Sequence, residues 1–227
     1  MEQIGFIGAY DKKDLLLNIA AVLNYFGKKT LIVDATSMQR FRYVVPMVNN
    51  TPSPTFVSEY NEIDVALGFM NLNGIAQYLG KNLNYDYILI DTDNLQTLNS
   101  FMIPALKKVF FVTSYDEYDL QRGIEILRYI QSPVLMYKIV LSADITPEQD
   151  AKLDHLTENL NVKWKEEKVQ FADETANRRV TLENQISKII KLKNYTSTYR
   201  DSLEYVVSLL TDASIDSSNL KRALKKI

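Results

Sequence analysis

Residues 1–36 read MEQIGFIGAYDKKDLLLNIAAVLNYFGKKTLIVDAT, and this stretch decides the fold. The apolar segment 3–8 predicts a short buried strand. The apolar residues that follow it recur at helical spacing up to Gly27, a residue type that commonly ends a helix. A β-rich run over 30–33 then ends at Asp34. A strand, a helix and a strand within about 30 residues form a βαβ unit, which predicts a parallel sheet covered by helices.

The rest of the chain continues this alternation of strands and helices. We expect strands over 85–91, 108–113 and 134–141 with a short extended piece at Trp164, helices over 63–83, 95–106, 116–130, 148–160, 180–193 and 196–210, and a loop over the proline-containing residues 46–62. The pattern predicts a doubly wound α/β domain over residues 1–210, with a mainly parallel sheet and helices on both faces. A polar linker over 211–218 and a basic tail over 219–227 follow it.

The composition excludes several classes of function. The 227 residues are 46% apolar and 24% charged, which is typical of a globular protein. The chain has no cysteine, which excludes a disulfide scaffold, a cysteine-ligated metal and a thiol nucleophile. Its one histidine, His155, is interpreted as a surface helix residue, and we expect no metal site. A net charge of -2 argues against a nucleic-acid partner, and the absence of a long apolar run or a signal peptide predicts a cytoplasmic protein.

Several segments together resemble the MinD/ParA branch of the P-loop ATPases, the deviant Walker A group of the SIMIBI class. In that family a strand, the motif GKGGVGKTT, a helix and a strand ending in aspartate follow one another, as in residues 3–34. YDYILIDT at 85–92 resembles the family's Walker B segment, and residues 110–127 and 171–210 resemble its later elements. The resemblance implies a P-loop NTPase-like fold, ATP and Mg²⁺ as cofactors, and dimerisation.

The phosphate loop departs from this family pattern. GKGGVGKTT falls on FIGAYDKKD, in which only Gly8 and Lys12 match. Ile7 replaces the signature lysine, which in the family reaches the partner's nucleotide. Asp11 replaces a glycine that lets backbone N–H groups approach phosphate. Lys13 replaces the threonine whose hydroxyl ligates Mg²⁺.

Acidic residues lie where the resemblance implies phosphate. Asp11 and Asp14 at a helix N-terminus each stabilise the helix dipole by about 0.3–1 kcal/mol, and they occupy the seat of an anion. A triphosphate within about 4 Å of such a carboxylate costs several kcal/mol at an effective dielectric constant near 20. We therefore expect no catalytic residue and no cofactor. The nucleotide-binding residues that the resemblance implies, here vestigial, are Gly8, Lys12, Lys13, Asp34 and Asp91.

Three of these residues have alternative interpretations. Lys12 is either a vestigial phosphate lysine or a solvated lysine that pairs with Asp11 or Asp14. Asp34 and Asp91 each end a strand at the carboxyl edge of the predicted sheet, where ligands bind in open α/β folds. They would handle Mg²⁺ or water, or else cap the turn that follows.

Two other features also leave alternatives open. The cluster of Arg40, Arg42 and Tyr43 follows the second strand, in the region where relatives carry switch and dimer contacts, and is either a partner site or a solvated loop. Trp164 is either an interface anchor or a partly buried residue at an edge.

The C-terminal tail has the pattern of a basic amphipathic helix. Its apolar residues have the spacing i, i+3, i+4 and i+7, and they are Leu220, Ala223, Leu224 and Ile227. Its other face holds Lys221, Arg222, Lys225 and Lys226. Because a helix this short is not stable alone in water, we expect it to order on binding. It resembles the membrane-targeting tail of MinD-type proteins, which implies an anionic membrane or a protein as its partner; the alternative is a basic C-terminus that docks on the body or is disordered.

Three functional hypotheses follow. The first is a non-catalytic MinD/ParA-like protein that localises or scaffolds a bacterial membrane-associated machine such as pilus assembly, as proteins of the TadZ/CpaE type do. Its partner would be a protein of that assembly, with a homodimer and peripheral attachment to the inner face of the cell membrane as further expectations. The alternative is a divergent ATPase that uses Lys12, Asp34 and Asp91 with Mg²⁺ and dimerises with ATP. The third is a DNA-associated protein.

Overall fold

The computed structural model describes residues 1–46, 53–142 and 145–227. The strands are β1 (Glu2–Ile7), β2 (Thr30–Asp34), β3 (Phe56–Tyr60), β4 (Ile63–Leu67), β5 (Tyr87–Thr92), β6 (Lys108–Thr113), β7 (Val134–Leu141) and β8 (Val162–Phe171). The α-helices are α1 (Lys13–Tyr25), α2 (Leu72–Leu79), α3 (Leu95–Ser100), α4 (Glu117–Leu127), α5 (Pro147–Thr157), α6 (Thr175–Ser187), α7 (Ser197–Leu210) and α8 (Ser217–Leu224). Short 3₁₀ turns are η1 (Arg40–Tyr43), η2 (Ile103–Ala105) and η3 (Leu192–Asn194).

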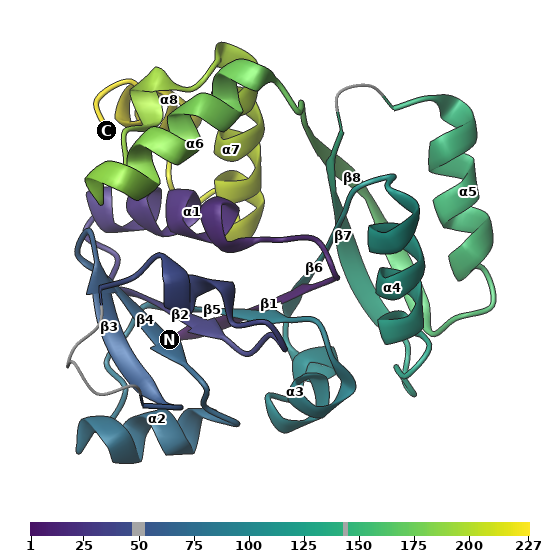
Figure 1. The fold of residues 1–227 in the computed structure, drawn as a ribbon. Coiled ribbons are helices and arrows are strands. Elements are labelled where there is room, and N and C mark those ends of the chain that lie inside the picture. The colour runs from purple at the N-terminus through teal and green to yellow at the C-terminus, as the bar shows by residue number, and fades with distance from the viewer. Residues whose placement is uncertain (47–52, 143–144) are drawn as a thin grey trace.

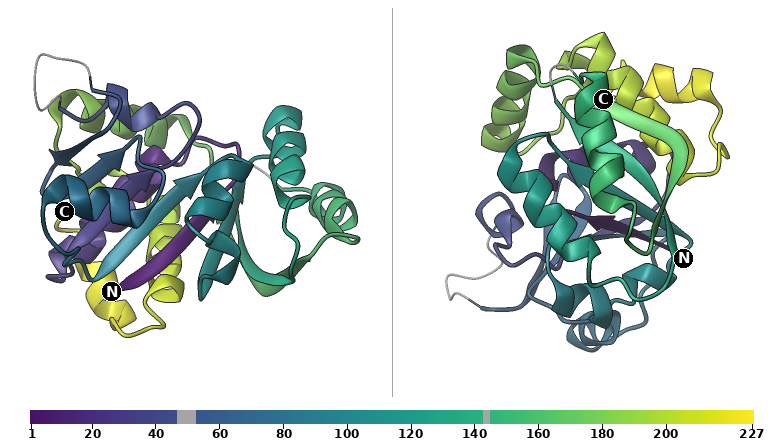
Figure 2. Two further views of the ribbon diagram at one scale, coloured as in Figure 1. Left: turned by 90° about the horizontal axis from the view of Figure 1, so that it is seen from below. Right: turned by 90° about the vertical axis from the view of Figure 1, so that its right-hand side faces the viewer.

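The strands form one eight-stranded sheet in the order β3-β4-β2-β5-β1-β6-β7-β8. Among the strand pairs in the described part of the chain, only β3–β4 is antiparallel. Helices α1, α6, α7 and α8 cover one face, and α2, α3, α4 and α5 lie on the other (Figures 1 and 2). The predicted doubly wound α/β fold, with a mainly parallel sheet between two layers of helices, is confirmed.

The central strands are buried on both faces, which explains why they are continuous apolar runs rather than alternating ones. In β1, Ile4 and Phe6 pack into the core beneath α1 and α7, whereas Ile7 packs into the core beneath α4. In β6, Phe110 faces the first core and Phe111 the second. Two hydrophobic cores, one on each face, therefore hold the sheet between its helices.

The connections change direction around β1, the strand that positions the site. After β1 the chain passes through α1 to β2, which lies on the β5 side of β1. After β5 the chain passes to β6, on the opposite side of β1. Such a reversal opens a crevice at the carboxyl ends of the strands, where ligands bind in open α/β sheets. The loop that follows β1 lies in this crevice.

The predictions for residues 46–83 are wrong in two places. The predicted loop over 46–62 contains strand β3, although its residues 47–52 lie outside the described part of the chain. The predicted helix over 63–83 begins instead as strand β4 and becomes helical only from Leu72. Asn61 and Glu62 have φ values of 50° and 64°, and they form the two-residue turn that pairs β3 with β4. The apolar residues of IDVAL fit the alternation of a strand and the spacing of a helix equally well. The segment is a strand because it pairs with β2 in the sheet.

The later elements follow the predictions with shifted bounds. The extended piece at Trp164 is the middle of a ten-residue edge strand, β8. The helix predicted over 180–193 is α6, which begins at Thr175 and ends before Lys188, a residue with φ of 57°. The helix predicted over 196–210 is α7, whose first turn is capped by the Thr196 side chain.

The tail is folded onto the body of the protein. Helix α8 packs against α7 and α1, and Leu220, Ala223 and Leu224 are fully or almost fully buried in their shared core. The Asp216 carboxylate caps the helix by accepting hydrogen bonds from two backbone N–H groups of its first turn. The expectation that this segment orders only on binding is therefore wrong for this structure, because each buried leucine supplies about 1.5–3 kcal/mol that the isolated helix lacks.

No helix in the described part of the chain is long and apolar enough to cross a membrane.

Candidate functional site

The loop after β1 passes directly against the end of β6. Gly8 has a φ of 141°, which side-chain-bearing residues rarely adopt, and a Cβ at this position would collide with the carbonyl oxygen of Val112. Gly8 also donates its N–H to the carbonyl oxygen of Thr92 on β5, at 3.2 Å. The close approach of this loop to β6 therefore requires a glycine at position 8, whether or not a ligand binds.

The Lys12 side chain folds back beneath this loop. Its Nζ donates to the carbonyl oxygens of Gly8 at 2.5 Å and Tyr10 at 3.0 Å. It also lies 3.0 Å from Oδ1 of Asp91, and the Lys12 side chain is only 1% exposed. The alternative of a solvated Lys12 paired with Asp11 or Asp14 is wrong. The ammonium thus has two carbonyl oxygens as hydrogen-bond acceptors and one carboxylate as its ion-pair partner.

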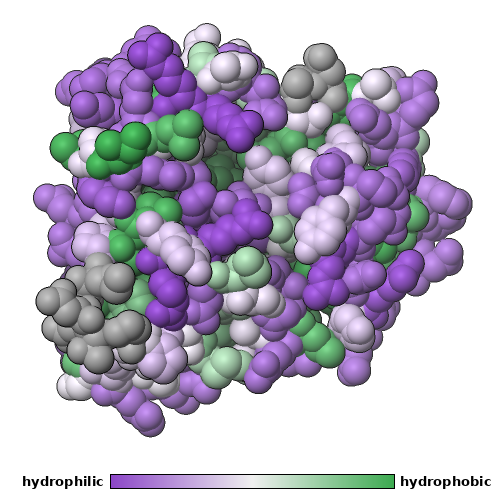
Figure 3. Space-filling view, in the orientation of Figure 1, coloured by the Kyte–Doolittle hydropathy of each residue, from purple (hydrophilic) through white to green (hydrophobic). Residues whose placement is uncertain are grey.

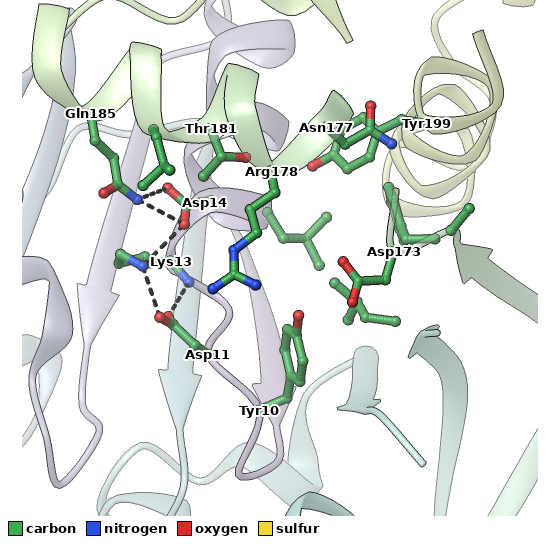
Figure 4. A pocket seen from close by; sticks show the side chains of 15 residues that line it. Tyr10, Asp11, Lys13, Asp14, Asp173, Asn177, Arg178, Thr181, Gln185 and Tyr199 are labelled. Atoms are coloured by element: carbon green, nitrogen blue, oxygen red, sulfur yellow. Dashed lines mark hydrogen bonds and ion pairs between the residues drawn. The ribbon is translucent and has the colours of Figure 1, made fainter. Parts of the chain in front are cut away.

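Lys13 instead pairs with both Asp11 of the loop and Asp14 of α1 (Figure 4). Its Nζ lies 2.8 Å from Oδ2 of Asp11 and 3.0 Å from Oδ2 of Asp14. Asp11 also accepts the backbone N–H of Lys13 at 3.2 Å, so its carboxylate occupies an anion position at the start of α1. Arg40 lies 3.1 Å from Asp11, and the Gln185 amide donates to Asp14 at 2.8 Å.

In this cluster each charged group stabilises the charged form of its ion-pair partner. Burial raises the pKa of the Asp11 carboxyl, but the neighbouring Lys13 outweighs it, and the pKa lies below its ordinary value. Burial lowers the pKa of Lys13, but Asp14 and Asp11 outweigh it, and that pKa lies above its ordinary value. Both partners are therefore charged at neutral pH.

Asp34 and Asp91 are opposite one another on the neighbouring strands β2 and β5. Asp34 accepts hydrogen bonds from the backbone N–H groups of Thr36 and Phe41, each at 3.1 Å, and from the Thr36 hydroxyl at 2.6 Å. It thus holds the turn after β2, the capping arrangement considered from the sequence. Burial raises the pKa of Asp34, and burial raises the pKa of Asp91 to about 7 despite the ion pair with Lys12.

The five residues proposed from the sequence thus meet at one edge of the sheet. Gly8, Lys12 and Lys13 come from the loop and α1, and Asp34 and Asp91 from the ends of β2 and β5. A cavity that Lys12, Asp34 and Asp91 help to line has a volume of only about 60 Å³. In the described part of the chain no group of three or more His, Cys, Asp or Glu side chains is arranged to hold a metal ion.

A second, larger cavity lies between α1 and α6. It has a volume of about 430 Å³ and reaches the ends of β7 and β8. Asp11, Lys13 and Asp14 form one wall of it, and Asn177 and Arg178 of α6 line it from the other side (Figure 4). Sequence reasoning missed the α6 residues, because nothing in their local pattern shows that α6 packs beside the start of α1.

The remaining sequence candidates lie outside these cavities, except Arg40. His155 is exposed on α5, as predicted. Trp164 is half-buried on the edge strand, where its Nε1 donates to the Thr157 hydroxyl. Arg42 donates to the carbonyl oxygens of Ser53 and Pro54, and neighbouring Tyr43 is 82% exposed.

Helix α6 also carries an exposed apolar stripe. Leu182 and Ile186 lie one turn apart near its C-terminal end, and Ile189 follows just after the helix ends at Ser187; Ile186 is 83% exposed. Figure 3 shows hydrophobic side chains gathered on the surface over this helix. Contiguous apolar side chains on a surface mark an interaction site more often than single ones do.

Comparison with solved structures identifies the fold. MinD of Pyrococcus furiosus, described as a cell division ATPase, matches with a TM-score of 0.61 and 13% identity over 94% of this chain and 99% of that one. This chain has the same fold as MinD. In the MinC:MinD cell division complex of Aquifex aeolicus the matched chain gives a TM-score of 0.59 and 13% identity, over 95% and 98% of the two chains.

A ParA family ATPase from Chlorobium tepidum gives a TM-score of 0.59 and 14% identity, over 92% of this chain and 98% of that one. No protein-family model and no curated protein sequence matches the chain. The chain thus has the α/β P-loop NTPase-like fold of MinD and ParA, which the sequence resemblance implied. At these identities the likeness concerns the fold and not the chemistry.

Proposed function

We propose that this protein is a MinD/ParA-like pseudo-ATPase, which binds partners and does not hydrolyse ATP. The observation that carries the proposal is the occupancy of the phosphate loop by its own side chains. The Asp11 carboxylate sits at the start of α1, where a phosphate would bind, and the Lys12 ammonium is committed to Asp91 and two carbonyl oxygens. A nucleotide's terminal phosphates would have to displace both.

The chemistry of the donor set also supports the proposal. Hydrolysis of ATP needs Mg²⁺ to bridge the phosphates, and a hydroxyl at the end of the phosphate loop usually ligates it. Lys13 occupies that position and contributes a positive charge instead of an oxygen ligand. Asp91 is engaged by Lys12, and the cavity beside it measures about 60 Å³. These residues do not fit a magnesium triphosphate.

The proposed role is localisation or scaffolding within a membrane-associated machine at the cytoplasmic side, of which pilus assembly is one example. The fold supports it, since one of the similar structures is a complex of MinD with the cell division protein MinC. The apolar stripe formed by Leu182 and Ile186 on α6 and by Ile189 just after it is a suitable surface for a protein partner or for a second copy.

In the proposed function the tail contributes the positive charges of its exposed face. Its apolar side chains are part of the core, so they do not contact a membrane in this conformation. Its exposed face presents Lys221, Arg222, Lys225 and Lys226. Each cation near an anionic lipid surface contributes about 1 kcal/mol, which makes α8 an auxiliary membrane contact in the proposal and not an anchor.

The test is titration calorimetry and a turnover assay with ATP and Mg²⁺. We expect neither binding heat nor phosphate release above a blank. The informative variant is Asp11→Gly with Lys13→Thr, which restores two of the residues that the resemblance implies and should restore nucleotide binding. Arg179→Gln, an exposed change on α6, serves as the control that should bind nothing. Tight Mg²⁺-dependent binding and turnover by the unchanged protein would favour the divergent ATPase instead.

A further inference from the structure

The cavity between α1 and α6 has no role in the proposed function, and it is built like a ligand site. Its volume of about 430 Å³ lies in the range of small-molecule pockets. Lys13, which forms part of its wall, is already neutralised by Asp11 and Asp14. A ligand would therefore find its polar partners on the opposite side, among Asp173, Asn177 and Arg178.

Asn177 presents a buried donor without an acceptor. The residue is 5% exposed and lines the cavity, and its Nδ2 has no hydrogen-bond partner in the described part of the chain. Its Oδ1 accepts the backbone N–H of Thr196 at 3.0 Å. This bond settles the orientation of the amide, because a flipped amide would point one N–H group at another. Buried donors are almost always satisfied in proteins, so a water or a ligand that enters the cavity is expected to supply the missing acceptor.

Two opposite charges border the same space. The Arg178 guanidinium extends into the cavity from α6, and the Asp173 carboxylate extends into it from the segment after β8 (Figure 4). Across residues 1–46, 53–142 and 145–227 neither side chain has a hydrogen bond or ion pair. The neighbouring Arg179 points elsewhere and pairs with Glu183 at 2.8 Å, so the free state of Arg178 is not a general property of this helix.

The remaining wall is apolar and aromatic. Leu15, Leu141 and Phe171 line the cavity together with the rings of Tyr10 and Tyr199. Burial raises the pKa of the Tyr10 hydroxyl, and Asp173 and Asp11 raise it further, which indicates a negative potential on this side. A polyanion such as a triphosphate is disfavoured there, whereas a ligand with one anionic and one cationic group has a partner for each.

We propose that this cavity binds a free α-amino acid with an apolar or aromatic side chain. Its carboxylate would accept hydrogen bonds from Arg178 and from the Asn177 amide, and its ammonium would pair with Asp173. The side chain would pack against the apolar wall, next to Leu15 and Phe171. The site would make the pseudo-ATPase responsive to a small metabolite, through a ligand that spans α1 and α6.

The experiment measures binding of each of the twenty amino acids to the full chain by calorimetry and ligand-observed NMR. One or a few apolar or aromatic amino acids should bind with one-to-one stoichiometry. Arg178→Gln and Asp173→Asn should each weaken binding at least tenfold. Both residues are exposed, so the variants should keep their fold, as circular dichroism would check. Arg179→Gln is the matched control and should bind as the unchanged protein does.

Chemical variants of the ligand separate its two charges. The amide of the best amino acid should lose the contribution of Arg178, and its N-acetyl form should lose that of Asp173. Failure of every amino acid to bind at millimolar concentration overturns this inference and leaves the proposed function standing. Equal binding of the charged and blocked forms also overturns it. ATP that binds in competition with the amino acid and is hydrolysed overturns the proposed function, because the filled loop would then accept a nucleotide and turn it over.

Discussion

The buried ion pair between Lys12 and Asp91 allows the interpretation of the loop to be tested through stability. Lys12→Met removes the ammonium and keeps much of the side-chain volume. At 3.0 Å and an effective dielectric constant near 20 the attraction is about 5.5 kcal/mol. Removing one partner leaves the other buried and uncompensated, which costs about 3–5 kcal/mol in proteins. We expect the free energy of unfolding to fall by that amount at pH 8.

The loss should depend on pH in a defined direction. Burial raises the pKa of Asp91 to about 7 in the folded protein, against about 3.9 in the unfolded chain. The stability that protonated Asp91 contributes is therefore complete below about pH 4 and is lost as the pH rises through 7. Without Lys12 the ionised carboxylate of Asp91 has no ion-pair partner, so its burial costs more free energy. The deficit of the variant should be larger at pH 8 than at pH 5.5, where Asp91 is protonated.

Urea unfolding followed by circular dichroism at the two pH values measures this effect. The set comprises Lys12→Met, Asp91→Asn, the double variant and the exposed control Lys81→Met, which should stay within about 0.5 kcal/mol of the unchanged protein. The double variant should be more stable than the sum of the single losses implies, because the residues are in contact. If Lys12→Met unfolds with an unchanged or higher free energy at pH 8, Lys12 is not a structural partner of Asp91, and the reasoning fails.

Three further predictions follow from single positions. Gly8→Ala should lower the free energy of unfolding by about 3 kcal/mol or more in thermal or urea melts, because φ is 141° and the new Cβ would meet the Val112 carbonyl oxygen; a melt like that of the unchanged protein would contradict the loop geometry. Leu220→Ala should cost about 2–5 kcal/mol whereas Lys221→Ala should cost almost nothing, and equal melts for the two would mean that α8 is not docked. Thr196→Ala should cost about 1 kcal/mol through the lost helix cap, and hydrogen exchange should show that the first turn of α7 opens more readily than in the unchanged protein.

The sequence predicted most of the elements where apolar runs are long. The strand pairs around β1 and the helix α7 follow the predicted bounds within a few residues, because a strand buried on both faces has a continuous apolar run that no exposed element shares. The failures lie at the β3–β4 hairpin. Ile63 and Leu67 match a helical spacing and an alternating one equally, so only the neighbouring strand β2 decides between them.

For the candidate site, too, one part could be predicted from the sequence and the other could not. The replacements Asp11 and Lys13 are visible in the sequence, and they already indicate that the phosphate-binding position differs from that of the resembled family. The partner of Lys12 is not visible, because Asp91 is 79 positions away along the chain and reaches the loop only through the pairing of β1 with β5. The orphaned amide of Asn177 is likewise a product of how α6 packs.

By itself, then, the sequence determined the order of strands and helices outside residues 46–83, the two-layered burial of the sheet and the acidic character of the loop, since these depend on local composition and periodicity. The tertiary structure alone decided that the amphipathic tail is docked and that Lys12 is buried. Whether an apolar stripe or a charge is free or satisfied depends on which remote surface lies against it, and periodicity along a chain carries no information about that surface.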